Sequence, residues 1–155
     1  MSEFTIIIGE HNHDDYLLIK TELSRLTLNF RFDHVTNGKC LLETLSWKWN
    51  NKERLPDLIL MELKMPVVDG LQTLKLIRGN SHFCHIPVVI YSSSWEEKEK
   101  TESEKLGANA ILKKAERMED LVFFVENIRH FFACWNLSPG PRFYDFDKTL
   151  NVPSN

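Results

Sequence analysis

The feature of this sequence that most limits its fold is a fivefold alternation of short apolar runs with longer segments of helical periodicity. The short runs are rich in β-forming residues, and some are apolar throughout, as in a strand buried on both faces. Between them, apolar residues recur every three or four positions, which indicates helices with one buried face. This alternation predicts an α/β fold in which helices cover both faces of a parallel sheet. We expect strands over 4–8, 30–35, 58–61, 86–91 and 109–112.

The expected helices follow these strands. The second helix starts after the Asn37-Gly38 turn and carries Leu41, Leu45 and Trp49 on one face. Ser94 and Glu97 have the spacing of a capping box, which predicts the start of the fourth helix at Ser94. The other four helices are expected, in chain order, over 14–28, 70–78, 94–106 and 118–135.

Composition limits the classes of protein that this chain can belong to. With 155 residues, of which 43% are hydrophobic and 26% charged, the chain is long enough for one compact core. Three cysteines are too few for a disulfide framework, and their odd number suits a reducing compartment. A net charge of −3 without a basic tract argues against nucleic-acid partners, and no segment has the length of a membrane span. We therefore expect a cytoplasmic protein.

Polar residues stand where the expected strands end. Glu10 and His11 follow the first strand, Glu62 the third, Ser92 the fourth and Lys114 the fifth. In open parallel sheets, functional groups collect at the carboxyl ends of the strands. These side chains are therefore the candidate site, whereas Asp14 and Asp15 are interpreted as solvated carboxylates that favour a helix start. 

Four motifs give the chain a family resemblance: EHNHDD at 10–15, PDLILMELKMPVVDG at 56–70, IPVVIYSSS at 86–94 and LGANAILKK at 106–114. In order and spacing they resemble the receiver domains of two-component response regulators, and most closely the single-domain, CheY-like members. The resemblance implies a flavodoxin-like, doubly wound sheet of five strands in the order 2-1-3-4-5, with five helices. It predicts a receiver domain over 1–133 and a C-terminal extension over 134–155.

The resemblance also implies roles for the candidate residues. Glu62 stands at the phosphoacceptor position, where the family has aspartate, and Glu10 and His11 stand at the acidic pair that holds Mg²⁺. Ser92 and Lys114 occupy the positions that contact the phosphoryl group. In the family, metal and lysine neutralise charge on the phosphoryl oxygens during in-line transfer.

Two departures from this pattern weaken the expected chemistry. His11 offers an imidazole where Mg²⁺ prefers oxygen, so Mg²⁺ binding by Glu10 and Glu62 should be weak or absent. The longer Glu62 side chain displaces its carboxylate by about 1.5 Å, and misplacements of that order cost roughly 10²-fold in rate. Ile111 also stands where the family has an aromatic switch residue, and Ala115 replaces the usual proline.

These departures predict a receiver that is not an enzyme, needs no cofactor and signals without being phosphorylated. Glu62 either imitates the charged, phosphorylated state or is inert in a domain that keeps only its shape. Two alternatives stay open at this stage: a working Mg²⁺-dependent phosphoacceptor, and a metal-binding domain organised by His11 and His13.

Function is then expected to depend on binding a sensor histidine kinase or another signalling protein. The segment 95–105 is charged and has almost no aliphatic residues, so its helix should be the least firmly docked. The last helix has an apolar arc wider than one contact with the sheet requires, and the tail is rich in aromatics. We predict that the tail packs on its own or a partner subunit, and that a homodimer forms. The interface candidates are Phe123, Phe131, Trp135, Phe143 and Tyr144.

Overall fold

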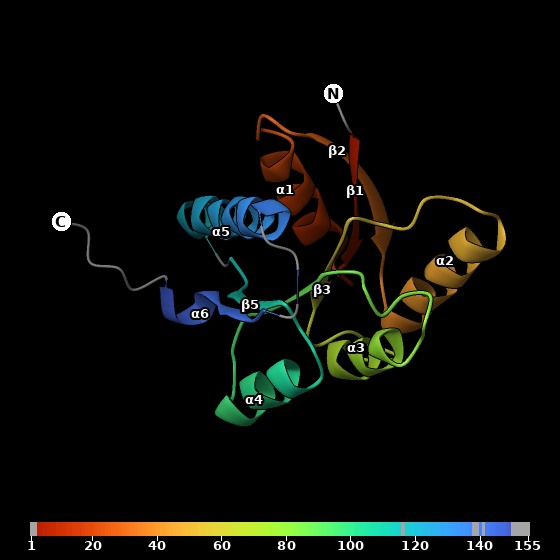
Figure 1. The fold of residues 1–155 in the computed structure, drawn as a ribbon. Helices are drawn as coiled ribbons and strands as arrows, with labels where there is room; N and C mark the ends of the chain where they lie inside the picture. Colours follow the sequence, from red (N-terminus) through yellow and green to blue (C-terminus); the bar gives the residue numbers. More distant parts are fainter. Residues whose placement is uncertain (1–2, 116, 138–139, 141, 150–155) are drawn as a thin grey trace.

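The structure is a computed structural model that describes residues 3–115, 117–137, 140 and 142–149. It contains one parallel sheet with helices on both faces (Figure 1). The strands are β1 Glu3–Gly9, β2 Asn29–Val35, β3 Leu58–Glu62, β4 Val88–Ser92, β5 Ala110–Lys113 and β6 Tyr144–Asp145. Their order is β2-β1-β3-β4-β5-β6, so the predicted five-strand order is confirmed and a short sixth strand is added at the β5 edge.

The helices lie where the periodicity predicted them, with one addition near the C-terminus. Their bounds are α1 His13–Leu23, α2 Gly38–Asn50, α3 Gly70–Arg78, α4 Glu97–Lys105, α5 Met118–Leu137 and α6 Phe146–Thr149. Asparagine and aspartate side chains cap three of them by accepting from the backbone N–H three residues on: Asn12 for α1, Asn37 for α2 and Asp69 for α3. None of the described helices is long and apolar enough to cross a membrane.

Two apolar layers lie on the two faces of the sheet, because successive strand residues point to opposite sides. Ile6 and Ile8 of β1 belong to the layer under α1 and α5, which lie side by side in Figure 1. Ile7, between them, belongs to the layer under α2 and α3, where Leu41 and Leu45 are fully buried. The continuous apolar runs of β3 and β4 thus reflect burial on both faces.

Three details differ from the expectation. Helix α1 ends at Leu23 rather than at residue 28. Beyond Ser24, the N–H groups of Arg25 and Leu26 donate to carbonyls three residues back instead of four, so the chain tightens into turns. The capping box of α4 consists of Glu96 and Glu99, two residues later than predicted, and the Glu96 N–H donates to the Glu99 carboxylate. Trp49 is not on the buried face of α2: it is 44% exposed and its ring stacks on His82.

The segment that follows α5 packs on its own chain. Strand β6 pairs in parallel with β5, Ala110 opposite Tyr144, and the Tyr144 N–H donates to the Asn109 carbonyl at 2.9 Å. Phe146 of α6 is 5% exposed and belongs to the layer under α5. Asp147 forms an ion pair with Lys100 of α4, so this C-terminal segment contacts both β5 and α4 (Figure 1).

Four of the five predicted interface residues are at least partly buried within the chain itself. Phe131 is 1% exposed and contacts the Tyr144 ring edge-on, so its side chain is in the core and not on the surface. Trp135, Phe143 and Tyr144 are partly buried, and Trp135 stacks on Phe131. Phe123, by contrast, is 60% exposed. The wide apolar arc of α5 is therefore covered largely by the sheet and by the chain's own C-terminal segment.

Candidate functional site

The predicted site residues come together at the carboxyl edge of the sheet. The Glu10 N–H donates to the Val35 carbonyl, which continues the pairing of β1 with β2 by one residue. The Lys114 N–H donates in the same way to the Ser92 carbonyl beyond the end of β5. Glu62 is the last residue of β3, between these strands. Parallel register therefore brings residues that are about fifty positions apart into side-chain contact.

Local structure holds the β3 end in place. Gly70 starts α3 against the strand, and its N–H donates to the Leu63 carbonyl at 2.8 Å. A Cβ at this position would lie 2.7 Å from the Glu62 carbonyl oxygen, closer than real side chains approach. The Asp69-Gly70 pair thus combines a helix cap with a residue that permits the close approach of α3 to the site.

Glu10 is fully buried and all its polar contacts lie within the site. Its Oε1 accepts from Lys114 Nζ at 2.8 Å and from the Tyr91 hydroxyl at 3.2 Å. Its Oε2 accepts from the Asn12 N–H at 3.2 Å. Burial raises the pKa of Glu10, but the hydrogen bonds with Glu62, Lys114 and Asn12 outweigh burial and leave the pKa below its ordinary value.

The two oxygens of Glu62 face different partners. Oε2 lies 2.5 Å from His11 Nδ1, and Oε1 lies 3.3 Å from Lys114 Nζ. Burial and the adjacent Glu10 carboxyl raise the pKa of Glu62 above its ordinary value, although Lys114 and His11 oppose the rise. The Glu62 side chain is only 9% exposed, so its carboxylate is a buried group that is held from both sides.

Lys114 connects three carboxylates. Its ammonium lies 2.8 Å from Asp15 Oδ2 as well as 2.8 Å from Glu10 and 3.3 Å from Glu62. Burial lowers the pKa of Lys114, but its bonds with Asp15 and Glu10 outweigh burial and raise the pKa above its ordinary range. Lys114, rather than its neighbour Lys113, is therefore the lysine of the site.

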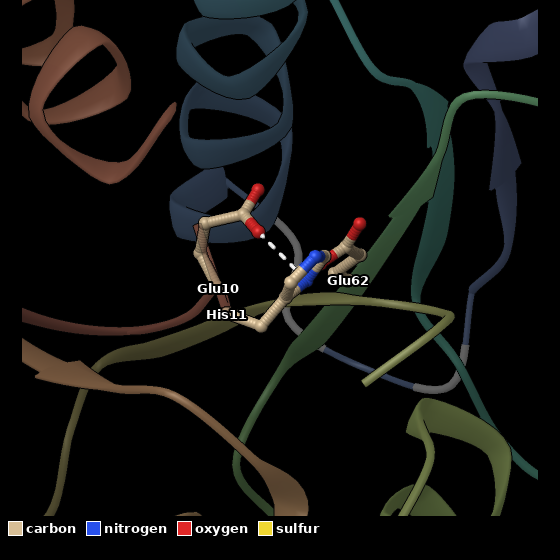
Figure 2. A group of neighbouring side chains, drawn as sticks. All are labelled: Glu10, His11 and Glu62. Atoms are coloured by element: carbon tan, nitrogen blue, oxygen red, sulfur yellow. Dashed lines mark hydrogen bonds and ion pairs between the residues drawn. The ribbon is translucent and has the colours of Figure 1, made fainter. Parts of the chain in front are cut away.

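His11 completes a cluster with the two glutamates. Figure 2 shows its imidazole directed toward Glu10 and Glu62, with Nδ1 3.4 Å from Glu10 Oε2. The side chain is 47% exposed, so one side of the cluster is open to solvent. The ring of His13 lies beside those of Tyr16 and His34 instead, so among the described residues His13 is not part of the cluster that His11 forms with the glutamates.

Ser92 and Ile111 are near the site without contacting Glu62. The Ser92 hydroxyl donates to the Ser94 carbonyl at 2.6 Å and accepts from the Ser94 N–H. Ile111 is fully buried in β5, where the family has a switch residue. Among the residues that the structure describes, the Glu62 carboxylate thus contacts the predicted lysine but not the predicted hydroxyl.

Sequence reasoning missed two members of the site. Asp15 was interpreted as a helix-start carboxylate, yet it contacts Lys114 because the first turn of α1 faces the end of β5. Tyr91 is fully buried, and its hydroxyl reaches Glu10 from β4. A signal for Tyr91 was its phenol within an otherwise apolar strand, since a buried hydroxyl needs a polar partner.

The site fits Mg²⁺ poorly. Mg²⁺ prefers an octahedral set of oxygens, whereas one of the three converging donors is an imidazole nitrogen. The nearest carboxylate pair, Glu10 and Glu62, already shares the ammonium of Lys114. These residues therefore lack the oxygen-only ligand set that Mg²⁺ prefers.

Comparison with known proteins places the chain in a family. A sequence profile of the response regulator receiver domain matches residues 6–126. The chain belongs to the response regulator receiver family. The predicted resemblance is thus confirmed, and with it a place among the receiver domains of two-component signalling.

Individual relatives agree with this assignment. The chain is 31% identical to the "Probable methanogenesis regulatory protein FilR2" of Methanothrix harundinacea over 89% of each chain. It is 29% identical to "Response regulator Rcp1" of Synechocystis sp., over 82% of this chain and 87% of that protein. A crystal structure of the phosphorylated cyanobacterial phytochrome response regulator RcpA superposes with a TM-score of 0.77, at 29% identity over 85% of this chain and 95% of that one.

Proposed function

We propose that this receiver domain acts by binding a signalling protein, a sensor histidine kinase or another regulator, without being phosphorylated. The observation that carries the proposal is the double engagement of Glu62, by His11 on one oxygen and Lys114 on the other. A nucleophilic carboxylate must present a free oxygen to the phosphorus atom in line with the leaving group. Here both oxygens have partners, and the side chain is longer than the aspartate of the family.

Charge balance within the site supports the same conclusion. In receivers that are phosphorylated, a divalent cation offsets the clustered carboxylates before and during transfer. In this chain the Lys114 ammonium and the His11 imidazole contact Glu10 and Glu62 directly. The site thus keeps its buried carboxylates paired by side chains of its own. We infer a single resting state that does not depend on Mg²⁺.

This state resembles the phosphorylated one only in part. Glu62 places negative charge against Lys114, as a phosphoryl group would, but it makes no hydrogen bond to Ser92 among the described residues. A carboxylate also carries less charge and fewer acceptor oxygens than a phosphoryl group. We therefore propose a constant binding surface rather than a switch that Glu62 holds in the active form.

The test uses beryllofluoride, a small mimic of the phosphoryl group, with Mg²⁺ and amide NMR shifts as the measurement. The natural chain should show no saturable shifts around Ser92 and Lys114. The double variant Glu62→Asp, His11→Asp restores an oxygen-only site with the shorter acceptor and should show them. The single variant Glu62→Gln is the matched control, because it keeps the side-chain length and removes the charge.

Either outcome is decisive for the proposal. A silent natural chain with a responsive double variant supports a receiver that has lost phosphoryl transfer through these two substitutions. Saturable shifts in the natural chain, together with a stable acyl phosphate formed from a small phosphodonor, would establish the competing function of a working phosphoacceptor.

A further inference from the structure

The two oxygens of Glu10, and likewise those of Glu62, face different partners: one faces Lys114 and the other faces His11. The Oε1 atoms of Glu10 and Glu62 both contact Lys114, at 2.8 and 3.3 Å. The Oε2 atoms of the same two residues both face His11 Nδ1, at 3.4 and 2.5 Å. Lys114 therefore orients the carboxylates from one side, and three electron-pair donors converge on the other (Figure 2).

This second side has the features of a three-ligand metal site. All three donor atoms lie within 4.8 Å of one another. Glu10 is held by Tyr91, Asn12 and Lys114, which is the kind of support that orients ligands in metalloproteins. The half-exposed His11 leaves an approach from solvent, so water can complete the coordination of a bound ion.

The donor set selects among metals. Imidazole nitrogen with two carboxylates suits Zn²⁺, which accepts nitrogen and oxygen ligands at four-coordinate sites, whereas Mg²⁺ gains little from imidazole. Three carboxylates, those of Glu10, Glu62 and Asp15, surround the single ammonium of Lys114. Lys114 contacts the Oε1 atoms of the two glutamates, so their Oε2 atoms are the oxygens available beside His11.

The geometry points to a site at Glu10, His11 and Glu62 that binds Zn²⁺ in preference to the Mg²⁺ of the family. Ligands of one zinc ion stand roughly 3.3 Å apart at tetrahedral angles and bonds of about 2.0 Å. The 2.5 Å contact of His11 with Glu62 must therefore lengthen by about 1 Å when the ion enters. The His11 ring can make that movement, because its side chain is 47% exposed.

The inference rests on the proposed function in one respect: a site that carries out no phosphoryl transfer can hold a resident ion. Binding would replace the contact between His11 and Glu62 with two metal bonds and change the exposed surface around Asn12. The ligand of this pocket is then a divalent transition metal ion rather than a phosphoryl group.

The test is calorimetric titration of the full, chelator-stripped chain with ZnCl₂, and separately with MgCl₂. One zinc ion should bind, and His11→Ala should weaken its binding at least about tenfold, since an imidazole ligand is lost. His13→Ala is the matched control and should leave binding unchanged, because His13 lies outside the cluster. His11→Asp should shift the preference toward Mg²⁺.

A second control addresses zinc held by thiols. Cys134 Sγ lies 3.5 Å from His130 Nε2, and this pair could retain zinc on its own. Cys134→Ser should therefore preserve the His11-dependent event, which NMR shifts of the His11 imidazole and the Asn12 amide locate. Unchanged zinc affinity in His11→Ala, or Mg²⁺ binding as tight as that of Zn²⁺, would overturn the inference. Failure here leaves the beryllofluoride result intact, so the two proposals are tested separately.

Discussion

At the scale of single residues, Glu10 and Glu62 show how one site treats two carboxylates differently. Both are buried, but Glu10 accepts from a phenol, a backbone N–H and an ammonium, whereas the described contacts of Glu62 are with His11, Lys114 and the Glu10 carboxyl. Hydrogen bonds to the charged form lower a pKa, and burial beside a like charge raises it. The pKa of Glu10 is lowered and that of Glu62 is raised for these reasons.

These directions predict opposite dependences of stability on pH. The contribution of Glu10 is present above its ordinary pKa of 4.5 and is lost as the pH falls through its lower folded-state pKa. Glu10→Gln should therefore cost about 1–3 kcal/mol of unfolding free energy near pH 7, and less below about pH 4. Urea unfolding of the natural chain and the variant at both pH values measures this difference.

Glu62→Gln provides the comparison. Because the folded-state pKa of Glu62 is raised, its protonated form stabilises the fold below pH 4.5, and this contribution is lost as the pH rises through the folded-state pKa. The variant should therefore lose less stability than Glu10→Gln at pH 7. A larger loss for Glu62→Gln, or a loss for Glu10→Gln that does not change with pH, would contradict the assignment.

At the scale of elements, α4 is held mainly by its ends and by one ion pair. Its nine residues contain no apolar side chain, and Ser103 is its single buried residue. Trp95 and Leu106, just outside the helix, pack against the layer under α2 and α3. Lys100 reaches Asp147 of α6, and this bond raises the Lys100 pKa. The prediction that α4 buries little is thus confirmed, and α6 supplies a contact that the sequence did not indicate.

A double-mutant cycle on Lys100 and Asp147 should give a coupling of about 0.5–1 kcal/mol, because the pair is mostly shielded from solvent. The pair of Lys100 with Glu97 is the internal control. Glu97 is 84% exposed and lies 3.7 Å away, so its coupling should be close to zero. Both cycles are measured by urea unfolding; equal couplings would show that α6 does not hold α4.

At the scale of the whole molecule, the C-terminal segment determines which apolar surface is exposed. With β6 and α6 in place, Phe131 and the β5 edge are covered, and the exposed apolar side chains on α5 include Val122 and Phe123. A homodimer remains a prediction, and its interface on this helix is now confined to residues such as Phe123. Open sheet edges and apolar patches favour association when they are uncovered.

Phe146→Ala should therefore destabilise the protein and promote self-association. Loss of the buried ring should cost about 1.5–3 kcal/mol, and the freed β5 edge should pair with a second copy. Thermal unfolding and multi-angle light scattering measure the two effects. Phe123→Glu is the matched variant: it should leave the melting temperature nearly unchanged and shift any dimer of the natural chain toward monomer.

Two results would contradict this account of the C-terminal segment. If Phe146→Ala melts like the natural chain, the segment contributes no stability. If Phe123→Glu does not change the molar mass of a natural chain that is dimeric, the dimer does not use the exposed face of α5.

Residue patterns along the chain predicted the first five strands, the first five helices, their order and the place of the site. The spacing of apolar residues is a local property of the chain, so apolar runs were enough to predict the strands. Because the carboxyl ends of parallel strands meet at one edge of the sheet, Glu10, Glu62 and Lys114 were expected together. Two local predictions were wrong: α1 ends at Leu23 and not at residue 28, and Trp49 is on the exposed side of α2. A helix boundary is decided by competing hydrogen bonds of about 1 kcal/mol, which periodicity does not register.

Packing in three dimensions decided which oxygen of each glutamate faces Lys114 and which faces His11. It also decided that Asp15 joins the site and that β6 covers the β5 edge. These contacts join residues far apart in the chain, or depend on side-chain rotamers that several neighbours fix together. Their geometry follows from packing of the whole domain, in which each choice is stabilised by contacts that no short stretch of sequence contains.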